Sequence, residues 1–378
     1  MEFSINNDLI RETIEIISNV VPTKSSFPIL TNILIKADEN KVVLIGNDNT
    51  NAIKKVLMND VEIIESGSLC VPCTLLKNVL NKFKGNITHF KRENNIIVIS
   101  NLKSKCKLNI VESDDYPEVD FKKLDNEFVI NTNELKDNIN TTINSCSKNE
   151  KRPILTGVNF NINNSQYRLI STDSYRIARV IKNIESQTIT NETNFTISNI
   201  SLKMLLKISE KTKSDTISIL WSNTNFDILF RVGDILFKTR FLDGVFPNTD
   251  KLFTSNFDNE LKFNRELLLE YLDRLCIFSD TNDMARNVIT FKFIDKELHA
   301  YGKNQIGNIE DVIECVNVDE KYNLEIAFSA EYLIEALKTF DSKNIVIEFN
   351  GNSRPFIVSD DSYSNEKVHL ILPIKIGD

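Results

Sequence analysis

Two cysteines in the first third of the chain have the spacing of a redox or metal site. Cys70 and Cys73 form a Cys-x-x-Cys pair, which elsewhere supplies half of a zinc site or the dithiol of a thioredoxin-like centre. A structural zinc needs two more ligands, and the sequence offers neither a second such pair nor a paired-histidine motif. We therefore expect the pair to mark the end of a strand and the start of a helix over 74–84, with a thioredoxin-like site as the alternative.

Other residues capable of covalent chemistry are few. His89, His299 and His369 each stand beside apolar or alternating residues, and we expect all three in strands. Asp48 and Asp173 could belong to a paired-carboxylate site, but neither has a partner visible in the sequence. Motifs of hydrolases, zinc proteases and nucleotide-binding loops are absent, and only 10 glycines occur. The sequence predicts no catalytic residue, no metal and no cofactor.

Composition limits the class of protein. A length of 378 residues predicts two or three domains, and 41% apolar with 26% charged residues is typical of globular proteins. The net charge of −8 excludes nucleic-acid binding by bulk positive charge, but it allows a local basic face. The N-terminus lacks the pattern of a signal peptide, and no apolar run of about 18 residues occurs. We expect a soluble, cytoplasmic protein.

The elements that would carry any site come in repeats. A short strand leads into a helix near Phe3, near Phe128 and again near Leu261. Phe3 and Phe128 are 125 positions apart, as are Pro28 and Pro153 in the following strand region. The third copy follows after about 132 positions. Equal offsets at two landmarks indicate duplication.

Each third contains a second strand-then-helix unit, which makes six related units in all. The second units begin near 68–71, 195–197 and 326–328. Apolar residues at helical spacing, such as Ile10, Ile14 and Ile17, predict that each helix buries one face against a sheet. The sequence therefore predicts an α+β protein of three similar domains in tandem, with boundaries at 1–122, 123–258 and 259–378.

Basic residues recur on the free face of the second helix in each third. They are Lys77, Lys82, Lys84, Lys203, Lys207, Lys211, Lys213, Lys338 and Lys343. A single basic helix face is usually ordinary solvated surface. Six related helices aligned by a repeat could instead present a lining that faces phosphates.

Several segments, together with the triple repeat, resemble one known family. Residues 152–157 (Arg-Pro-Ile-Leu-Thr-Gly), 171–178 (Ser-Thr-Asp-Ser-Tyr-Arg-Ile-Ala) and 242–247 (Leu-Asp-Gly-Val-Phe-Pro) resemble the beta subunit of bacterial DNA polymerase III, the sliding clamp. Residues 354–358 and 370–375 belong to the same pattern, and the resemblance covers the whole chain in order.

The resemblance implies a DNA clamp fold that closes as a head-to-tail homodimeric ring, with helices inside and sheets outside. Such a ring encircles double-stranded DNA without regard to sequence and acts as a processivity factor in DNA replication. It performs no catalysis and needs no cofactor or membrane. The implied protein partners are the replicative polymerase catalytic subunit, the clamp loader, and other replication and repair proteins that carry a clamp-binding motif.

The resemblance also implies three sets of site residues. The partner-peptide pocket would comprise Leu155, Thr172, Ser174, Tyr175, Arg176, Ile177, Pro247, Leu252, Leu370, Leu372, Pro373 and Ile374. DNA contacts would come from Lys24, Lys151, Arg152 and Arg286. The dimer interface would join Lys105, Cys106 and Leu108 to Ile277, Phe278, Glu310 and Asp311. Lys105 and Lys107 opposite Glu310 and Asp311 would favour head-to-tail association.

The pocket departs from the family pattern at two positions. Tyr175 stands where the family often has His, and Ile374 where it often has Met. Both substitutions keep bulk, so they bear on peptide preference more than on binding. The alternative reading for each pocket residue is a core position in the seam between the middle and last domains.

Two other classes of protein are alternatives. One is a hydrolase or transferase built on duplicated α+β domains, which the missing catalytic constellation disfavours. The other is a monomeric protein-binding scaffold that does not bind DNA, which a size measurement would separate from a dimer.

Overall fold

The computed structural model describes residues 1–374 apart from 123, 185–191, 223–225, 254–256, 258, 279–286, 295–296, 316–324 and 363–365. The chain divides into two compact units. The first joins Met1–Leu135 to Ile200–Phe241, and the second joins Lys136–Asn199 to Leu242–Asp378.

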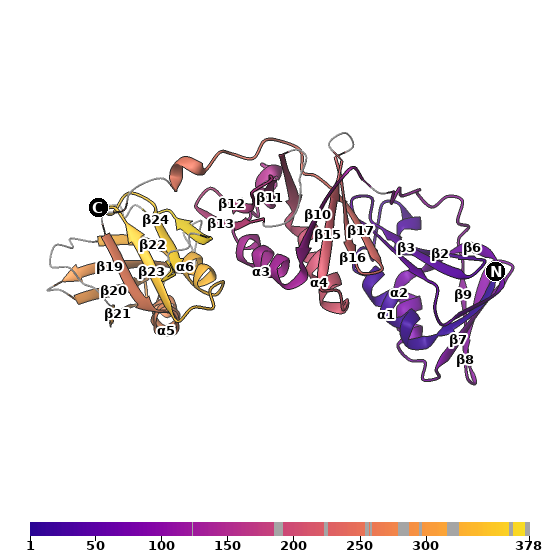
Figure 1. Cartoon of the computed structure of the whole chain (residues 1–378). Helices are drawn as coiled ribbons and strands as arrows, with labels where there is room; N and C mark the ends of the chain where they lie inside the picture. Colours follow the sequence, from indigo (N-terminus) through magenta and orange to yellow (C-terminus); the bar gives the residue numbers. More distant parts are fainter. Residues whose placement is uncertain are drawn as a thin grey trace. The chain divides into compact units, whose positions relative to one another are not determined.

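The first unit contains two antiparallel sheets and two helices that pack on one another (Figure 1). One sheet has the order β5 (Val61–Glu65), β1 (Glu2–Asn6), β7 (Ile87–Glu93), β8 (Ile96–Asn101), β9 (Ser104–Asn109). The other runs β10 (Asn126–Asn131), β15 (Thr216–Trp221), β16 (Asp227–Val232), β17 (Ile235–Arg240), β4 (Ala52–Leu57), β3 (Lys41–Asn47), β2 (Asn32–Asp38), β6 (Gly67–Pro72). The helices are α1 (Asn7–Ile17) and α2 (Cys73–Leu80), and the 3-10 turn η1 is Pro28–Thr31.

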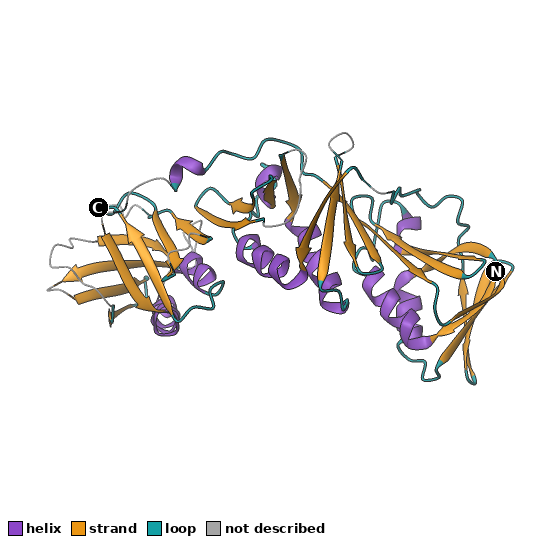
Figure 2. Ribbon diagram, viewed as in Figure 1, coloured by secondary structure: helices purple, strands orange, loops and turns teal. Residues whose placement is uncertain are grey.

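The second unit repeats this plan (Figure 2). Its larger sheet runs β14 (Thr193–Ser198), β11 (Gly157–Ile162), β12 (Gln166–Thr172), β13 (Arg176–Asn183), β25 (Lys367–Ile371), β24 (Phe356–Asp360), β23 (Asn344–Phe349), β18 (Asn259–Asn264). Its smaller sheet runs β21 (Asn308–Ile313), β20 (Glu297–Lys303), β19 (Val288–Ile294), β22 (Glu325–Ser329). Its remaining elements are α5 (Arg265–Leu275), α6 (Ala330–Leu337), and the 3-10 turns η2 (Pro153–Thr156), η3 (Asp250–Leu252) and η4 (Cys276–Phe278). Two further helices, α3 (Thr132–Ile143) and α4 (Asn199–Lys211), cross the division between the units.

The first helix of each third starts from an asparagine cap. The side chain of Asn6 accepts hydrogen bonds from the backbone N–H groups of Asp8 (2.9 Å) and Leu9 (3.1 Å). The side chains of Asn131 and Asn264 likewise accept hydrogen bonds from the backbone N–H groups two and three residues further on. An N-cap of this kind stabilises a helix by about 1 kcal/mol, so the repeat preserves the local signal that turns a strand into a helix.

The apolar helix stripes are buried as their spacing predicts. Ile10, Ile14 and Ile17 of α1 are each 0% exposed. The tandem α+β prediction is thereby confirmed at the level of single elements, since α1, α3 and α5 follow β1, β10 and β18 directly.

The Cys-x-x-Cys pair is structural. Cys70 lies near the end of β6 and Cys73 is the first residue of α2, as predicted. The helix ends at Leu80, before the predicted end at residue 84. Both side chains are buried, and this burial raises the pKa of the Cys70 thiol to about 12 and of the Cys73 thiol to about 11. A redox thiol requires a thiolate near neutral pH, so the burial of both thiols disfavours the thioredoxin-like alternative. Over the part of the chain that the structure describes, no cluster of His, Cys, Asp and Glu is able to hold a metal ion.

All three histidines lie in strands, as predicted: His89 in β7, His299 in β20 and His369 in β25. Among the described helices, none is long and apolar enough to cross a membrane.

His369 is the one of these three that is fully enclosed. Its Nε2 lies 2.9 Å from the Thr339 hydroxyl, and that hydroxyl donates to the Ala336 carbonyl oxygen (2.7 Å). The imidazole therefore donates through Nε2–H. Burial, aided by the positive charges of Lys367 and Arg176, lowers the pKa of His369 to about 3.

This burial predicts an acid-sensitive fold. The unfolded His369 takes up a proton near pH 6.5, whereas the folded one resists protonation down to about pH 3. Between these values the unfolded state binds more protons, so the free energy of unfolding falls as pH falls, by up to about 1.4 kcal/mol per pH unit. The difference between the melting temperatures at pH 7.5 and at pH 5 should therefore be smaller in His369→Leu than in the parent chain. An equal pH dependence of the melting temperature in His369→Leu and in the parent chain would contradict the assignment.

Candidate functional site

An open cavity of about 450 Å³ lies in the second unit. Three segments form it: the loop from the end of α3 to η2, the turn between β12 and β13, and helix α6. The lining residues are Cys146, Ser147, Lys148, Asn149, Lys151, Arg152, Leu155, Asp173, Ser174, Tyr175, Arg176 and Tyr332.

The turn between β12 and β13 has a fixed shape. The Asp173 side chain accepts hydrogen bonds from the backbone N–H groups of Tyr175 (3.0 Å) and Arg176 (3.1 Å). The Thr172 hydroxyl donates to the Arg176 carbonyl oxygen at 2.7 Å. Ser174 has a φ of +79°, a backbone conformation that residues other than Gly and Asn rarely adopt. This turn leaves Tyr175 46% exposed at the mouth of the cavity.

Arg176 is a structural cation. It is 7% exposed, and its Nε contacts Asp173 Oδ2 at 3.1 Å while one terminal nitrogen pairs with Glu335. The other terminal nitrogen donates to the Asn144 carbonyl oxygen at 2.5 Å, and the guanidinium lies 4.2 Å from the centre of the Tyr332 ring. All three nitrogens therefore have partners, so Arg176 joins the start of β13 to α6 and to the end of α3.

The rim of the cavity is basic. Lys148, Lys151 and Arg152 are exposed and, within the described ranges, form no ion pair. Leu155, by contrast, is only 5% exposed at the base. The cavity thus combines aromatic and aliphatic walls with cations at its edge, and it holds no arrangement of nucleophile and base.

Four residues of the predicted pocket line this cavity, namely Leu155, Ser174, Tyr175 and Arg176, and the rest lie outside it. Ile177 and Leu370 are 5% and 1% exposed and pair across β13 and β25, so they support the wall from behind. Leu372 is 36% exposed, and its backbone N–H donates to the Tyr175 carbonyl oxygen at 3.0 Å. Of the other predicted pocket residues, Thr172 is buried, Pro247 and Leu252 are exposed, and Pro373 and Ile374 are half-buried.

Sequence analysis missed Tyr332, Glu335 and Asn144. Glu335 and Asn144 accept hydrogen bonds from the Arg176 side chain, whereas the Tyr332 ring packs against its guanidinium. The apolar stripe of α6 gives no sign of these contacts, because Tyr332 and Glu335 lie on its half-exposed positions.

The predicted DNA-contact residues are exposed where the structure describes them. Lys24, Lys151 and Arg152 all have exposed side chains, and Arg286 lies outside the described residues. Two lysines of the predicted basic lining are engaged within the chain. Lys211 forms an ion pair with Glu15 at 2.5 Å, and Lys77 donates to the Ser18 hydroxyl at 3.1 Å.

The other predicted lysines of the lining have exposed side chains. They are Lys82, Lys84, Lys203, Lys207, Lys213, Lys338 and Lys343.

The predicted dimer-interface residues lie on sheet edges or beside one. Lys105, Cys106 and Leu108 are in β9, the last strand of its sheet, and Glu310 and Asp311 are in β21, likewise an edge. Ile277 and Phe278 are in η4, which packs near β20, and Ile277 is 69% exposed.

The acidic pair on β21 is already engaged. Glu310 lies 2.8 Å from His299 Nδ1 and accepts from the Tyr301 hydroxyl at 3.0 Å, and these hydrogen bonds lower the pKa of Glu310. Asp311 accepts from Arg274 Nε at 3.1 Å. Any attraction of these carboxylates for a second copy competes with these contacts.

Comparison with known proteins covers the whole chain. Domain models of the DNA polymerase III beta subunit match in order: the N-terminal domain at residues 1–120, the central domain at 129–248 and the C-terminal domain at 250–375. The chain is 29% identical to a beta sliding clamp of Staphylococcus epidermidis and 28% identical to one of Staphylococcus aureus, over 99% of each chain.

Solved structures agree with these matches. A DNA polymerase sliding clamp of Bacillus subtilis aligns over 100% of both chains with a TM-score of 0.92 and 26% identity. A DNA polymerase III beta chain of Streptococcus pneumoniae aligns over 99% of this chain and 100% of its own, with a TM-score of 0.93 and 26% identity.

Fold, site and matches together define a three-domain DNA clamp, a processivity factor without a catalytic centre. The chain belongs to the DNA polymerase III beta subunit family.

The Arg176 contacts predict a marked loss of stability in Arg176→Met. The change keeps the side-chain bulk but leaves Asp173 and Glu335 without their cation, and removing one partner of a buried pair costs about 3–5 kcal/mol. Chemical denaturation should show this loss, whereas Arg152→Met at the exposed rim should unfold like the parent. Equal stability of the two variants would show that Arg176 is not the structural cation described.

Proposed function

We propose that this chain closes with a second copy into a ring around double-stranded DNA, and that the cavity beside Tyr175 tethers the replicative polymerase to that ring. The match of all three family domains in order carries the proposal. The clamp loader and other proteins with a clamp-binding motif would use the same cavity. Because the DNA is inside the cell, we place the protein in the cytoplasm.

The cavity suits a short peptide with one or two apolar anchors. Leu155 and the Tyr332 ring supply an apolar base, and Tyr175 is exposed at the mouth. Leu372 lies outside the lining, but its backbone N–H bonds to the Tyr175 carbonyl oxygen, so its exposed side chain adds apolar surface beside Tyr175. Desolvation of a Leu or Phe side chain against such a wall supplies most of the affinity in a small interface. The cations Lys148, Lys151 and Arg152 would favour acidic residues next to the anchor. Arg176 would act by holding the turn in place, because its nitrogens are already engaged.

Ring closure is supported by two exposed strand edges. β9 and β21 each end a sheet, so each presents a row of backbone groups without a neighbouring strand in the described chain. Antiparallel or parallel pairing of β9 with β21 of a second copy would satisfy both rows at once and remove both edges. Exposed Ile277, with Phe278, would add apolar area to that contact. A head-to-tail contact of this type closes into a ring when the rotation between copies is right.

A ring explains how an acidic chain can hold DNA. Topology retains the duplex, so individual phosphate contacts need only be weak and independent of sequence. Lys24, Lys151 and Arg152 are the exposed candidates for these contacts.

The tethering proposal predicts that Leu372→Lys abolishes binding of a synthetic peptide with Leu and Phe anchors. Leu372 is 36% exposed, so the new ammonium group stays hydrated and the melting temperature should change little, while the apolar mouth is lost. We expect at least a tenfold loss of affinity by fluorescence anisotropy.

The matched variant is Leu370→Lys, two residues earlier on the same segment. Leu370 is 1% exposed, so this change buries an unpaired charge and should collapse the melting temperature. If Leu372→Lys kept full affinity, the peptide site would lie elsewhere; if it unfolded like Leu370→Lys, Leu372 would be seam core.

A further inference from the structure

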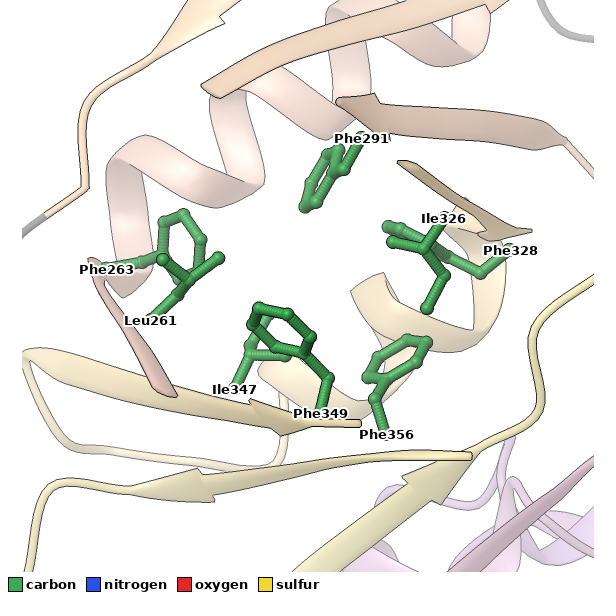
Figure 3. Close-up of a pocket in the computed structure, with 8 residues that line it drawn as sticks. All are labelled: Leu261, Phe263, Phe291, Ile326, Phe328, Ile347, Phe349 and Phe356. Atoms are coloured by element: carbon green, nitrogen blue, oxygen red, sulfur yellow. The ribbon is translucent and has the colours of Figure 1, made fainter. Parts of the chain in front are cut away.

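The larger sheet of the second unit is covered on both faces. Residues along a strand alternate between the faces, so Phe356 and Ile357 of β24 lie on opposite sides. Phe356 belongs to the core of the last third, where it borders a gap of about 10 Å³ that is lined by apolar side chains (Figure 3). That gap has room for at most one water and offers it no polar partner, so it is a dry packing defect.

The segment between β17 and β18 covers the opposite face. Side chains from β12, β13, β24 and β25 form a buried apolar cluster there, namely Ile170, Ile177, Ile357, Val368 and Leu370. Phe246, Phe253 and Phe257 of the covering segment pack against this cluster. We call residues 246–253 the strap.

The strap has little regular structure of its own. Its helical part is η3, a single 3-10 turn of three residues. Asn248 Oδ1 accepts a hydrogen bond from the Asp250 N–H at 2.9 Å. The Leu252 N–H donates to the Thr249 carbonyl oxygen at 3.0 Å, and the Phe253 N–H donates to that of Asp250 at 3.1 Å. One such turn does not persist by itself, so its position on the sheet depends on tertiary contacts.

Two arginines of the sheet supply those contacts. Arg168 in β12 forms an ion pair with Asp250 at 2.5 Å. Arg179 in β13 places its guanidinium 3.8 Å from the centre of the Phe253 ring. Burial, together with the nearby charge of Arg168, lowers the pKa of Arg179, and a desolvated guanidinium binds an aromatic face more strongly than a hydrated one. The two contacts hold the strap at positions 250 and 253, one on each side of Leu252.

Held in this way, the strap keeps an apolar side chain in contact with solvent. Leu252 is 44% exposed, although it belongs to the turn that the two arginines fix. Pro247 of the same strap is exposed as well. An apolar side chain on a fixed backbone loses less conformational entropy on binding than one on a loose loop, so fixing the strap favours binding at Leu252.

The strap lies over the strands that form the cavity beside Tyr175. Ile177, in the cluster under the strap, directly follows Arg176, which lines that cavity. Leu370 of the same cluster is two residues before Leu372, whose backbone bonds to Tyr175. The apolar surface under the strap is therefore continuous with the wall of the cavity.

We propose that Arg168 and Arg179 are positioning residues for partner binding. By fixing the strap at Asp250 and Phe253, they hold Leu252 where an apolar anchor of the bound peptide packs against it. The resemblance implies a place for Leu252 in the peptide site, and the two arginines act on that site without touching the peptide. This role rests on the tethering function proposed above.

The test measures the affinity for an uncharged synthetic peptide with Leu and Phe anchors by fluorescence anisotropy. Arg168→Gln should lower the affinity about fivefold, because it releases one end of the strap. Asp250→Asn should lower it equally, and Arg168→Lys, which keeps the ion pair, should restore most of it. In Leu252→Ala, which itself weakens binding, adding Arg168→Gln should have no further effect, since the residue that Arg168 positions is then gone.

Arg179→Met tests the other contact, because it keeps the bulk of the side chain and removes the cation from the Phe253 ring. It should lower the affinity to a similar extent. Lys182→Gln is the matched control: Lys182 also lies in β13 and pairs with Glu366, which is not part of the strap. This variant should bind the peptide like the parent chain. Melting temperatures should change little in all of these variants, since partly exposed ion pairs contribute little to stability.

The outcomes separate the positioning role from the tethering function. Full affinity in Arg168→Gln, with affinity lost in Leu372→Lys, would overturn the positioning role and leave the tethering function standing. Full affinity in both would count against the tethering function itself. Equal losses in Arg168→Gln and Lys182→Gln, or additive losses with Leu252→Ala, would also overturn the positioning role. If Arg168→Gln did not fold, Asp250→Asn would carry the same test from the exposed side of the pair.

Discussion

The rest of the structure depends on backbone pairing between strands that belong to different copies of the repeat. β17 pairs with β4, and β25 pairs with β13, so each eight-stranded sheet is built from two copies of the repeat. The paired strands are nearly two hundred residues apart in the chain. Closing such a long loop costs chain entropy, so the fold cannot form from local signals alone. The pairings also fix where the turns at Asp48 and Asp173 lie relative to the ends of β17 and β25. The cavity beside Tyr175 is a consequence of that register.

A fixed register means that few side chains set the chemical character of each seam. A capped turn and a strand end recur with the same backbone, and Lys238 and Arg240 stand at the repeat positions of Leu370 and Leu372. Arg176 forms ion pairs with Asp173 and Glu335. They hold a turn whose residue Ser174 has a positive φ, so that Tyr175 is presented at the mouth of the cavity. The scaffold is duplicated, and the side chains at its two seams differ while the backbone is the same.

Sequence patterns predicted those parts of the molecule that depend on local periodicity and on the repeat. The stripe through Ile10, Ile14 and Ile17, the strand positions of the histidines and the tandem organisation are local or follow from equal spacing. The roles of single charged residues could not be predicted in this way. The pairing of Lys211 with Glu15 and of Arg176 with Glu335 joins residues 196 and 159 positions apart, and these contacts exist only after packing. Exposure within the predicted pocket was likewise hidden, because Leu370 and Leu372 look alike in sequence. Leu370 lies within β25 and is 1% exposed, whereas Leu372 follows the end of that strand and is 36% exposed.

Retention on DNA tests the central claim, that the chain holds DNA by enclosing it, most directly. The chain is loaded with a clamp loader onto nicked circular DNA, and bound protein is measured by gel filtration before and after a single restriction cut. A closed ring should stay on the circle at high salt and be lost from the linear form, and the double variant Ile277→Ala, Phe278→Ala should be lost from both. Equal retention on circular and linear DNA, falling with salt in each, would show binding by surface charge and would contradict the account.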